Sequence, residues 1–213
     1  MAVIAVTGRK GGIGKSTITA NLAAELLAMG HRVVVLDADP QRSLIAWAGL
    51  GEGVLRDLVQ PADAAHPRQF RAAVDAANRR ADRVLIDCPP GFADPALLAA
   101  LVADLVLLPS GPSPLDIMAA RDALALAREA VSQRKNGKPA IRFVPSKVTV
   151  TNLGRELPDS LAALGEGVLP SIGQRTVAAE ATLSGLTVRE AANGSAAQAE
   201  FAKLAAAVEE VLA

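Results

Sequence analysis

The chain has 213 residues, which is the size of one ordinary domain and is long enough to bury a substantial core. Its 22 basic and 22 acidic residues cancel, so the overall charge gives no argument for nucleic-acid binding. The single cysteine, Cys88, excludes an intrachain disulfide and argues against an iron–sulfur cluster. No apolar run approaches the ~18 residues of a membrane span, and the first strand leaves no room for a signal peptide, so we expect a cytoplasmic protein.

Apolar runs of strand length alternate with longer amphipathic stretches along the chain. Strands are predicted at residues 3–6, 32–36, 83–86, 105–108 and 141–144. Helices are predicted at residues 16–29, 71–80, 95–103, 116–133, 152–163 and 196–212. Residues 49–69 have the composition of a loop, and the segment between the last two helices has no clear pattern. The alternation predicts a doubly wound α/β fold, with a mainly parallel sheet flanked by helices, in a single domain of residues 1–213.

A glycine-rich segment between the first strand and the first helix predicts a phosphate-binding loop. It reads Lys10-Gly11-Gly12-Ile13-Gly14-Lys15-Ser16-Thr17. Glycines let successive backbone N–H groups point at one anion, and the helix N-terminus adds the positive end of its dipole. We expect Lys15 to reach the β- and γ-phosphates and the Ser16 hydroxyl to hold Mg²⁺. The usual pattern is G-x-x-x-x-G-K-[ST], but Arg9 occupies the first glycine position and a second lysine, Lys10, follows it.

This loop resembles the deviant Walker A loop, K-G-G-x-G-K-[ST], of the ParA/MinD group of P-loop ATPases. The resemblance implies that residues 10–17 bind ATP and that Lys15 serves the nucleotide of its own subunit. It also implies that Lys10 reaches the phosphates held by a second, identical subunit. A lysine delivered in trans can neutralise charge on the γ-phosphate as an arginine finger does. The active form would then be a homodimer with two nucleotides face to face.

Aspartates follow the next strands and are candidate catalytic or metal-binding residues. Asp87 closes the apolar run VLID, a Walker B arrangement in which a carboxylate binds Mg²⁺ directly or through water. Asp39, in the D-x-D-P-Q motif, resembles the ParA residue that orients the attacking water, and we also count it as a metal ligand with Ser16 and Asp87. Asp37 matches its neighbour near the metal. The carboxyl ends of parallel strands share one edge, so these residues should meet the glycine loop there, although each aspartate has the alternative of an ordinary turn or cap role.

Two further segments match the family. Pro112 lies in a P-S-P-L-D turn that resembles the turn at the family's dimer face, and the same residues also suit a rigid strand-to-helix turn with Asp116 in the first helical turn. Arg175, in the segment I-G-Q-R, matches a region near the nucleotide base or the DNA-facing side. Both are candidate nucleotide contacts. Many relatives carry an asparagine that reads the base after the fifth strand, whereas this chain has Pro145-Ser146-Lys147, so the adenine contacts stay unassigned.

Basic residues gather between positions 121 and 155, where eight face only two acidic residues. They are Arg121, Arg128, Arg134, Lys135, Lys138, Arg142, Lys147 and Arg155. This local excess predicts a footprint for non-specific DNA binding through phosphates. The alternative is a solvated helix face whose charge is balanced elsewhere.

The resemblance extends from the first strand to the final helix. It implies a nucleoid-associated ATPase that uses ATP and Mg²⁺, works as a homodimer on DNA, and partitions or positions a plasmid, chromosome or protein assembly. A ParB-like or other cargo adaptor would stimulate hydrolysis. MinD-like proteins end in a basic amphipathic helix, whereas residues 201–213 are acidic and alanine-rich, so we expect no membrane partner. Two alternatives stay open: a nucleotide-dependent recruitment scaffold of the VirC type, and a MinD-like spatial regulator without a membrane helix.

Overall fold

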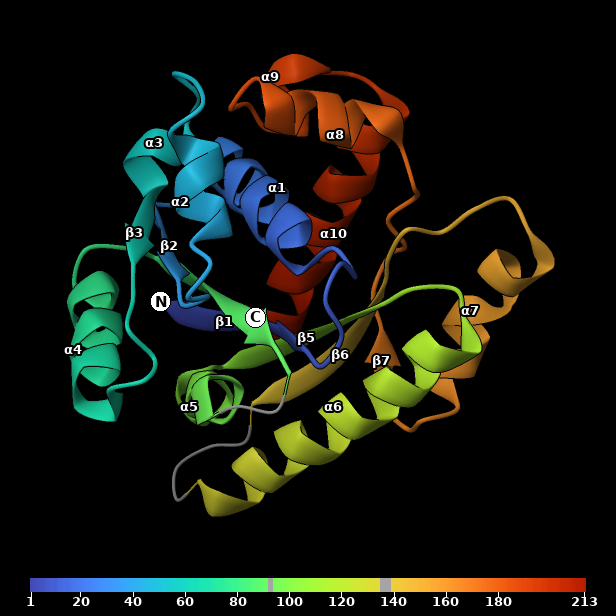
Figure 1. The fold of residues 1–213 in the computed structure, drawn as a ribbon, viewed down its shortest axis with the longest axis horizontal. Coiled ribbons are helices and arrows are strands. Elements are labelled where there is room, and N and C mark those ends of the chain that lie inside the picture. Colours follow the sequence, from blue (N-terminus) through green and yellow to red (C-terminus); the bar gives the residue numbers. More distant parts are fainter. Residues whose placement is uncertain (92–93, 135–138) are drawn as a thin grey trace.

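The computed structural model describes residues 1–91, 94–134 and 139–213. Within them, seven parallel strands form one sheet in the order β3-β2-β4-β1-β5-β6-β7 (Figure 1). The strands are β1 (Ala2–Gly8), β2 (Val33–Asp37), β3 (Val59–Pro61), β4 (Arg83–Pro90), β5 (Leu105–Ser110), β6 (Ala140–Pro145) and β7 (Gly167–Val168). The predicted doubly wound α/β fold with a parallel sheet is confirmed.

Helices cover both faces of the sheet (Figure 1). They are α1 (Lys15–Ala28), α2 (Ser43–Ala48), α3 (Leu55–Leu58), α4 (Pro67–Asn78), α5 (Asp94–Val102), α6 (Pro114–Gln133), α7 (Asn152–Ala162), α8 (Thr176–Leu183), α9 (Val188–Ala191) and α10 (Ala196–Leu212). Helices α4 to α7 contribute to one apolar core, and α1, α2, α3, α9 and α10 to the other. Successive residues of β1 alternate between the two cores, as side chains of a strand buried on both faces must.

Residues 49–69, expected to be a loop, contain more structure than the sequence pattern indicates. The segment holds α3, the three-residue edge strand β3 and the first turn of α4, which begins at Pro67. Elements this short carry too few residues to display a helical or strand period, so the loop prediction was wrong here. The same reason explains α2, which was not predicted, and the unassigned segment that contains β7, α8 and α9.

The strand order brings the polar strand ends together. Strand β4 lies between β1 and β2, and Asp87 is paired in register with Val6 on one side and Asp37 on the other. The glycine loop leaves the same edge of the sheet between β1 and α1. Parallel strands thus create a shared polar edge from segments far apart in the sequence. In the described parts of the chain, no helix is long and apolar enough to cross a membrane.

Candidate functional site

The glycine loop presents a row of unused backbone donors. Gly12 and Gly14 have φ angles of 73° and 93°, in the left-handed region that favours glycine. Added Cβ atoms at Gly11 and Gly12 would meet nothing within 4 Å, so the loop faces open space. No backbone N–H of residues 11–17 donates a hydrogen bond to another described residue. These donors, next to the N-terminus of α1, form a cradle suited to a phosphate chain.

Lys15 lies at the centre of this loop. Its side chain is buried, and Nζ donates a hydrogen bond to the carbonyl oxygen of Lys10 over 3.1 Å. Burial lowers the pKa of Lys15, and the nearby Asp87 carboxylate opposes that effect. A bound phosphate would add negative charge beside the amine and favour its charged form. The geometry fits a counter-charge for phosphate.

Asp87 and Ser16 form a buried carboxylate–hydroxyl pair. Ser16 Oγ donates to Asp87 Oδ2 over 2.6 Å, and Thr19 Oγ1 lies 3.4 Å from Oδ1. Desolvation raises the pKa of Asp87 to about 7, although the Ser16 bond lowers it. Hard oxygen donors of this kind fit Mg²⁺, which usually keeps waters and substrate phosphates as its other ligands. Among the described residues, there is no group of three or more His, Cys, Asp or Glu side chains that could by itself hold a metal ion.

Asp37 and Asp39 have different surroundings. Asp37 is fully buried and both of its oxygens accept backbone hydrogen bonds: Oδ2 from Leu44 and Ile45 at 3.1 Å each, and Oδ1 from Asp39 at 3.2 Å. It therefore caps the start of α2, the structural role left open for it above. Asp39 Oδ1 accepts the Gln41 N–H over 2.9 Å, while Oδ2 makes no hydrogen bond within the described structure. Asp39 thus keeps one oxygen available for a water or metal.

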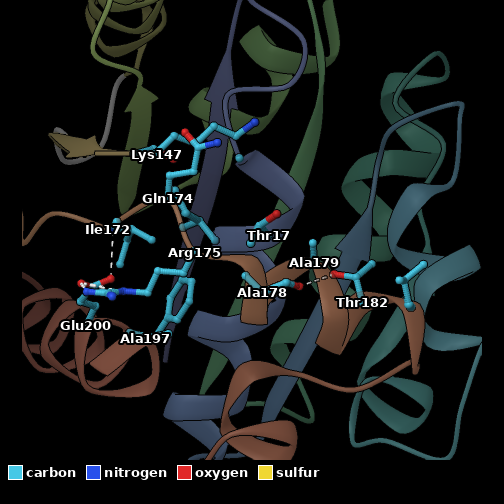
Figure 2. A pocket seen from close by; sticks show the side chains of 16 residues that line it. Thr17, Lys147, Ile172, Gln174, Arg175, Ala178, Ala179, Thr182, Ala197 and Glu200 are labelled. Atoms are coloured by element: carbon cyan, nitrogen blue, oxygen red, sulfur yellow. Dashed lines mark hydrogen bonds and ion pairs between the residues drawn. The ribbon is translucent and has the colours of Figure 1, made fainter. Parts of the chain in front are cut away.

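Two adjoining cavities lie over the loop. The first, about 280 Å³, is lined by Gly11, Gly12, Gly14, Lys15, Ser16, Thr17, Asp39, Ser43, Pro90 and Lys147. The second, about 470 Å³, shares Gly14, Thr17 and Lys147 with it and extends between α8 and α10 (Figure 2). A Cβ on Gly14 would lie 2.7 Å from Ser146 Oγ, so glycine is needed where the cavities meet. The pair has the shape of a polar phosphate site joined to a larger, more apolar chamber.

Arg175 lies in the larger chamber, beside Glu200. Arg175 Nη2 and Glu200 Oε1 are 2.5 Å apart, and the Gly173 N–H donates to Glu200 Oε2 over 2.9 Å (Figure 2). Phe201 of α10 contributes apolar surface to the same lining. These contacts order the I-G-Q-R segment against α10 and leave a chamber of suitable size for a nucleoside.

Four candidate residues lie outside the linings of both cavities: Lys10, Ile13, Pro112 and Asp87. Lys10 Nζ is 2.6 Å from Asp116 Oδ1, at the start of α6. Pro112 lies in the turn between β5 and α6, and Ile13 is buried in contact distance of Gly8. In one subunit, therefore, the linings contain the loop glycines, Lys15, Ser16, Thr17, Asp39 and Arg175 but not these four, although Asp87 is hydrogen-bonded to Ser16 of the lining.

The described residues of the predicted basic footprint belong to several elements. Arg128 pairs with Glu166, and the side chains of Arg134 and Arg142 donate to backbone carbonyls. Lys135 and Lys138 lie outside the described residues. Arg121 and Arg128 lie on α6, Arg142 on β6 and Arg155 on α7, and Lys147 follows β6; DNA binding by this stretch stays a prediction.

Sequence reasoning missed Lys147 and Glu200. Lys147 follows β6 at the same edge as the other strand ends and lines both cavities. The rule that ligands bind at the carboxyl ends of parallel strands, called the strand-end rule below, could have identified it. Glu200 lies on α10, 25 residues beyond Arg175, and no sequence signal links the two.

Comparisons with known proteins agree with this geometry. Residues 4–188 match the CobQ/CobB/MinD/ParA nucleotide binding domain. The maintenance of carboxysome distribution protein A of Halothiobacillus neapolitanus is 32% identical over 87% of this chain and 85% of that protein. The chromosome-partitioning ATPase Soj of Thermus thermophilus is 32% identical over 99% of this chain and 95% of that protein. The septum site-determining protein MinD of Pyrococcus horikoshii, solved with Mg-ADP, shares the fold, with a TM-score of 0.79 and 22% identity over 99% of this chain and 97% of that chain.

Proposed function

This chain belongs to the CobQ/CobB/MinD/ParA family of nucleotide-binding domains, and from that membership we propose that it is a single-domain ATPase that dimerises with ATP. The dimer binds DNA non-specifically and partitions or positions a cargo, and a cargo adaptor stimulates hydrolysis. The protein cycles between the nucleoid and the surrounding cytoplasm. The relatives named for carboxysome distribution and chromosome partitioning support the positioning role without specifying the cargo.

The different positions of the two loop lysines, Lys15 and Lys10, are the main support for this proposal. Lys15 is buried in the cradle, where it can serve the subunit's own nucleotide. Lys10 is directed away from the cavities and pairs with Asp116. Within one subunit this lysine only ties the loop to α6, so it is available to meet a nucleotide brought by a second subunit.

The residues around the cradle suit hydrolysis. The N–H groups of residues 11–17 and Lys15 bind the phosphates, and Ser16 with Asp87 would hold Mg²⁺. When bound, Mg²⁺ neutralises charge on the phosphates. Asp39 orients the attacking water through its free Oδ2. Phosphoryl transfer depends mainly on positioning and charge neutralisation, so this small set is sufficient.

The test is to measure mass by light scattering, phosphate release and retention on random duplex DNA, with ATP, with ADP and without nucleotide. We expect a dimer, slow turnover and DNA retention with ATP and magnesium only. A monomer in all three conditions would overturn the in-trans arrangement. An ATP-dependent dimer that does not bind DNA would favour the recruitment scaffold, and binding to anionic vesicles instead would favour the MinD-like regulator.

A further inference from the structure

Helix α4 exposes a row of arginines. Arg68, Arg71 and Arg79 are exposed and lie on the side of the helix opposite the buried Phe70 and Val74. From Arg68 to Arg79, the C-cap residue of α4, the chain advances 11 residue steps, or about 16 Å along the helix axis. In Figure 1 the helix lies at the outer edge of the molecule, beside the edge strand β3.

The side chains of these arginines are not paired with acidic groups. None of the three guanidinium groups makes a hydrogen bond or ion pair with another described residue. Arg80 binds only the neutral amide oxygen of Gln60. Asp75, the single acidic residue of α4, is exposed and lies one turn from both Arg71 and Arg79, so it offsets one of the three positive charges of the row.

The acidic residues flanking α4 have other partners. Asp63 lies 2.7 Å from His66 Nδ1, and Asp82 pairs with Arg32 over the same distance. The surroundings therefore leave a local excess of positive charge in a chain whose overall charge is zero.

The arginine row is better suited to binding the phosphates of duplex DNA than to binding a membrane surface. A membrane-surface helix needs a free apolar face, but Phe70, Val74 and Ala77 of α4 are buried in the core. Arginine binds phosphate oxygens in bidentate geometry. Over about 16 Å of duplex axis, each strand presents roughly five phosphates, so all three guanidinium groups can engage one backbone.

We infer that α4, rather than the stretch from 121 to 155, is the principal DNA-binding surface of this protein. The inference rests on the proposed DNA-binding dimer and specifies its surface. Two subunits present two such rows, and engaging both raises the effective affinity beyond that of one row. ATP-dependent dimerisation thereby becomes ATP-dependent DNA binding without any new contact.

The segment before α4 is also bound to the nucleotide-sensing loop. Arg42 Nη1 donates to the carbonyl oxygen of Ala62 over 3.0 Å and also to that of Asp37, while the Ala62 N–H donates to Asp37 over 2.9 Å. Arg42 holds a φ of 53°, so these contacts maintain a backbone conformation that non-glycine residues rarely adopt. Movement of the loop that follows Asp39 would be transmitted directly to the segment that starts α4.

The experiment compares two triple variants for binding to a labelled random-sequence duplex with ATP and magnesium. The first is Arg68→Gln, Arg71→Gln and Arg79→Gln. The control is Arg121→Gln, Arg155→Gln and Lys203→Gln, three exposed cations that also lack partners within the described residues. Glutamine removes the charge but preserves helix propensity. Light scattering, ATP turnover and thermal unfolding verify that both variants fold, dimerise and hydrolyse ATP as the wild type does.

We expect the α4 variant to lose roughly tenfold or more in DNA affinity. For a dimer that engages six arginines, the slope of the logarithm of the binding constant against the logarithm of salt concentration should become less negative by about five. The control should retain most of its affinity. If the α4 variant binds DNA as tightly as the wild type, or if only the control variant binds more weakly, this inference is overturned and the proposed function is left intact. Absence of wild-type binding to DNA in ATP would overturn both.

Discussion

Lys10 Nζ lies 2.6 Å from Asp116 Oδ1, so the glycine loop is tied to the first turn of α6 within one subunit. Burial opposes ionisation of Asp116, but hydrogen bonds from Lys10 and Ser113 hold its pKa below the ordinary value. If Lys10 acts on the nucleotide of a second subunit, as we propose, dimerisation has to replace this contact.

Replacing Lys10 with alanine should leave nucleotide binding by the monomer largely intact but remove dimerisation and hydrolysis. The reason is that Lys10 lines neither cavity of its own subunit. Gel filtration with ATP and magnesium measures the dimer, and titration with a fluorescent ATP analogue measures binding. An undiminished dimer would show that Lys10 does not act in trans.

Replacing Lys15 with alanine should abolish nucleotide binding, because the phosphates lose the one buried amine in the cradle. Calorimetric titration with ATP measures the loss. Lys147→Ala is the matched control, because this lysine lines the same cavities from another strand end, and we expect it to weaken binding less. Equal losses of ATP affinity in the two variants would mean that Lys15 is no more important for phosphate binding than Lys147.

Replacing Asp39 and replacing Asp37 should produce different defects, one in ATP turnover and the other in folding stability. Asp39→Ala should bind ATP and dimerise but turn over at least tenfold more slowly, because it acts on the water and not on the bound phosphates. Asp37→Ala should lose about 1–3 kcal/mol of folding free energy, because it leaves backbone donors at the start of α2 without acceptors.

Single-turnover hydrolysis and chemical denaturation distinguish these effects. A normal hydrolysis rate in Asp39→Ala would return Asp39 to the status of a turn residue. Unchanged stability in Asp37→Ala would show that its buried hydrogen bonds are readily replaced by water.

The strand-end rule predicted the polar half of the site from sequence alone, because parallel strands must end at one edge. It predicts that the glycine loop, Asp39 and Asp87 lie at one edge of the sheet, and the structure places them there. The contact of Arg175 with Glu200 depends instead on how α10 packs against the sheet, which no local pattern encodes.

The basic stretch gives less information about a surface than its charge count suggests. Arg128 and Arg142, which are close in sequence, lie on different elements and bind different partners, so charge counted along the chain does not by itself locate charge on a surface. The row on α4 has the helical spacing that a count over a fixed stretch does not detect.

Nucleotide-free protein should become less stable as the pH rises. The folded state keeps the Asp87 proton up to a pKa of about 7, whereas the unfolded chain releases it near 3.8. Unfolding therefore releases a proton between about pH 4 and 7, and stability falls by up to about 4 kcal/mol across that window and is constant above it.

Chemical denaturation from pH 5 to 8 measures this slope. Asp87→Asn is the control, because asparagine is neutral at every pH, and we expect a flatter profile with higher stability at pH 8. An equally steep profile in that variant would assign the proton to another group.

Trp47 gives a direct test of whether the segment after Asp39 responds to nucleotide. Trp47 is the only tryptophan, and it lies in α2, whose first turn is capped by Asp37. Its indole Nε1 donates to the carbonyl oxygen of Leu186 over 3.1 Å, so the ring connects α2 to the segment between α8 and α9. Because Asp39 lines the phosphate cavity a few residues earlier, a γ-phosphate that orders this loop must change the surroundings of the indole.

We therefore expect the tryptophan emission of the Asp39→Ala protein to shift when ATP and magnesium are added, and to shift less with ADP. Lys15→Ala is the control, because it should bind neither nucleotide and show no shift. If Asp39→Ala binds ATP by calorimetry but its emission stays constant, α2 is rigid. Communication from the nucleotide to the dimer face would then run through the turn that holds Asp116, where Lys10 is already engaged.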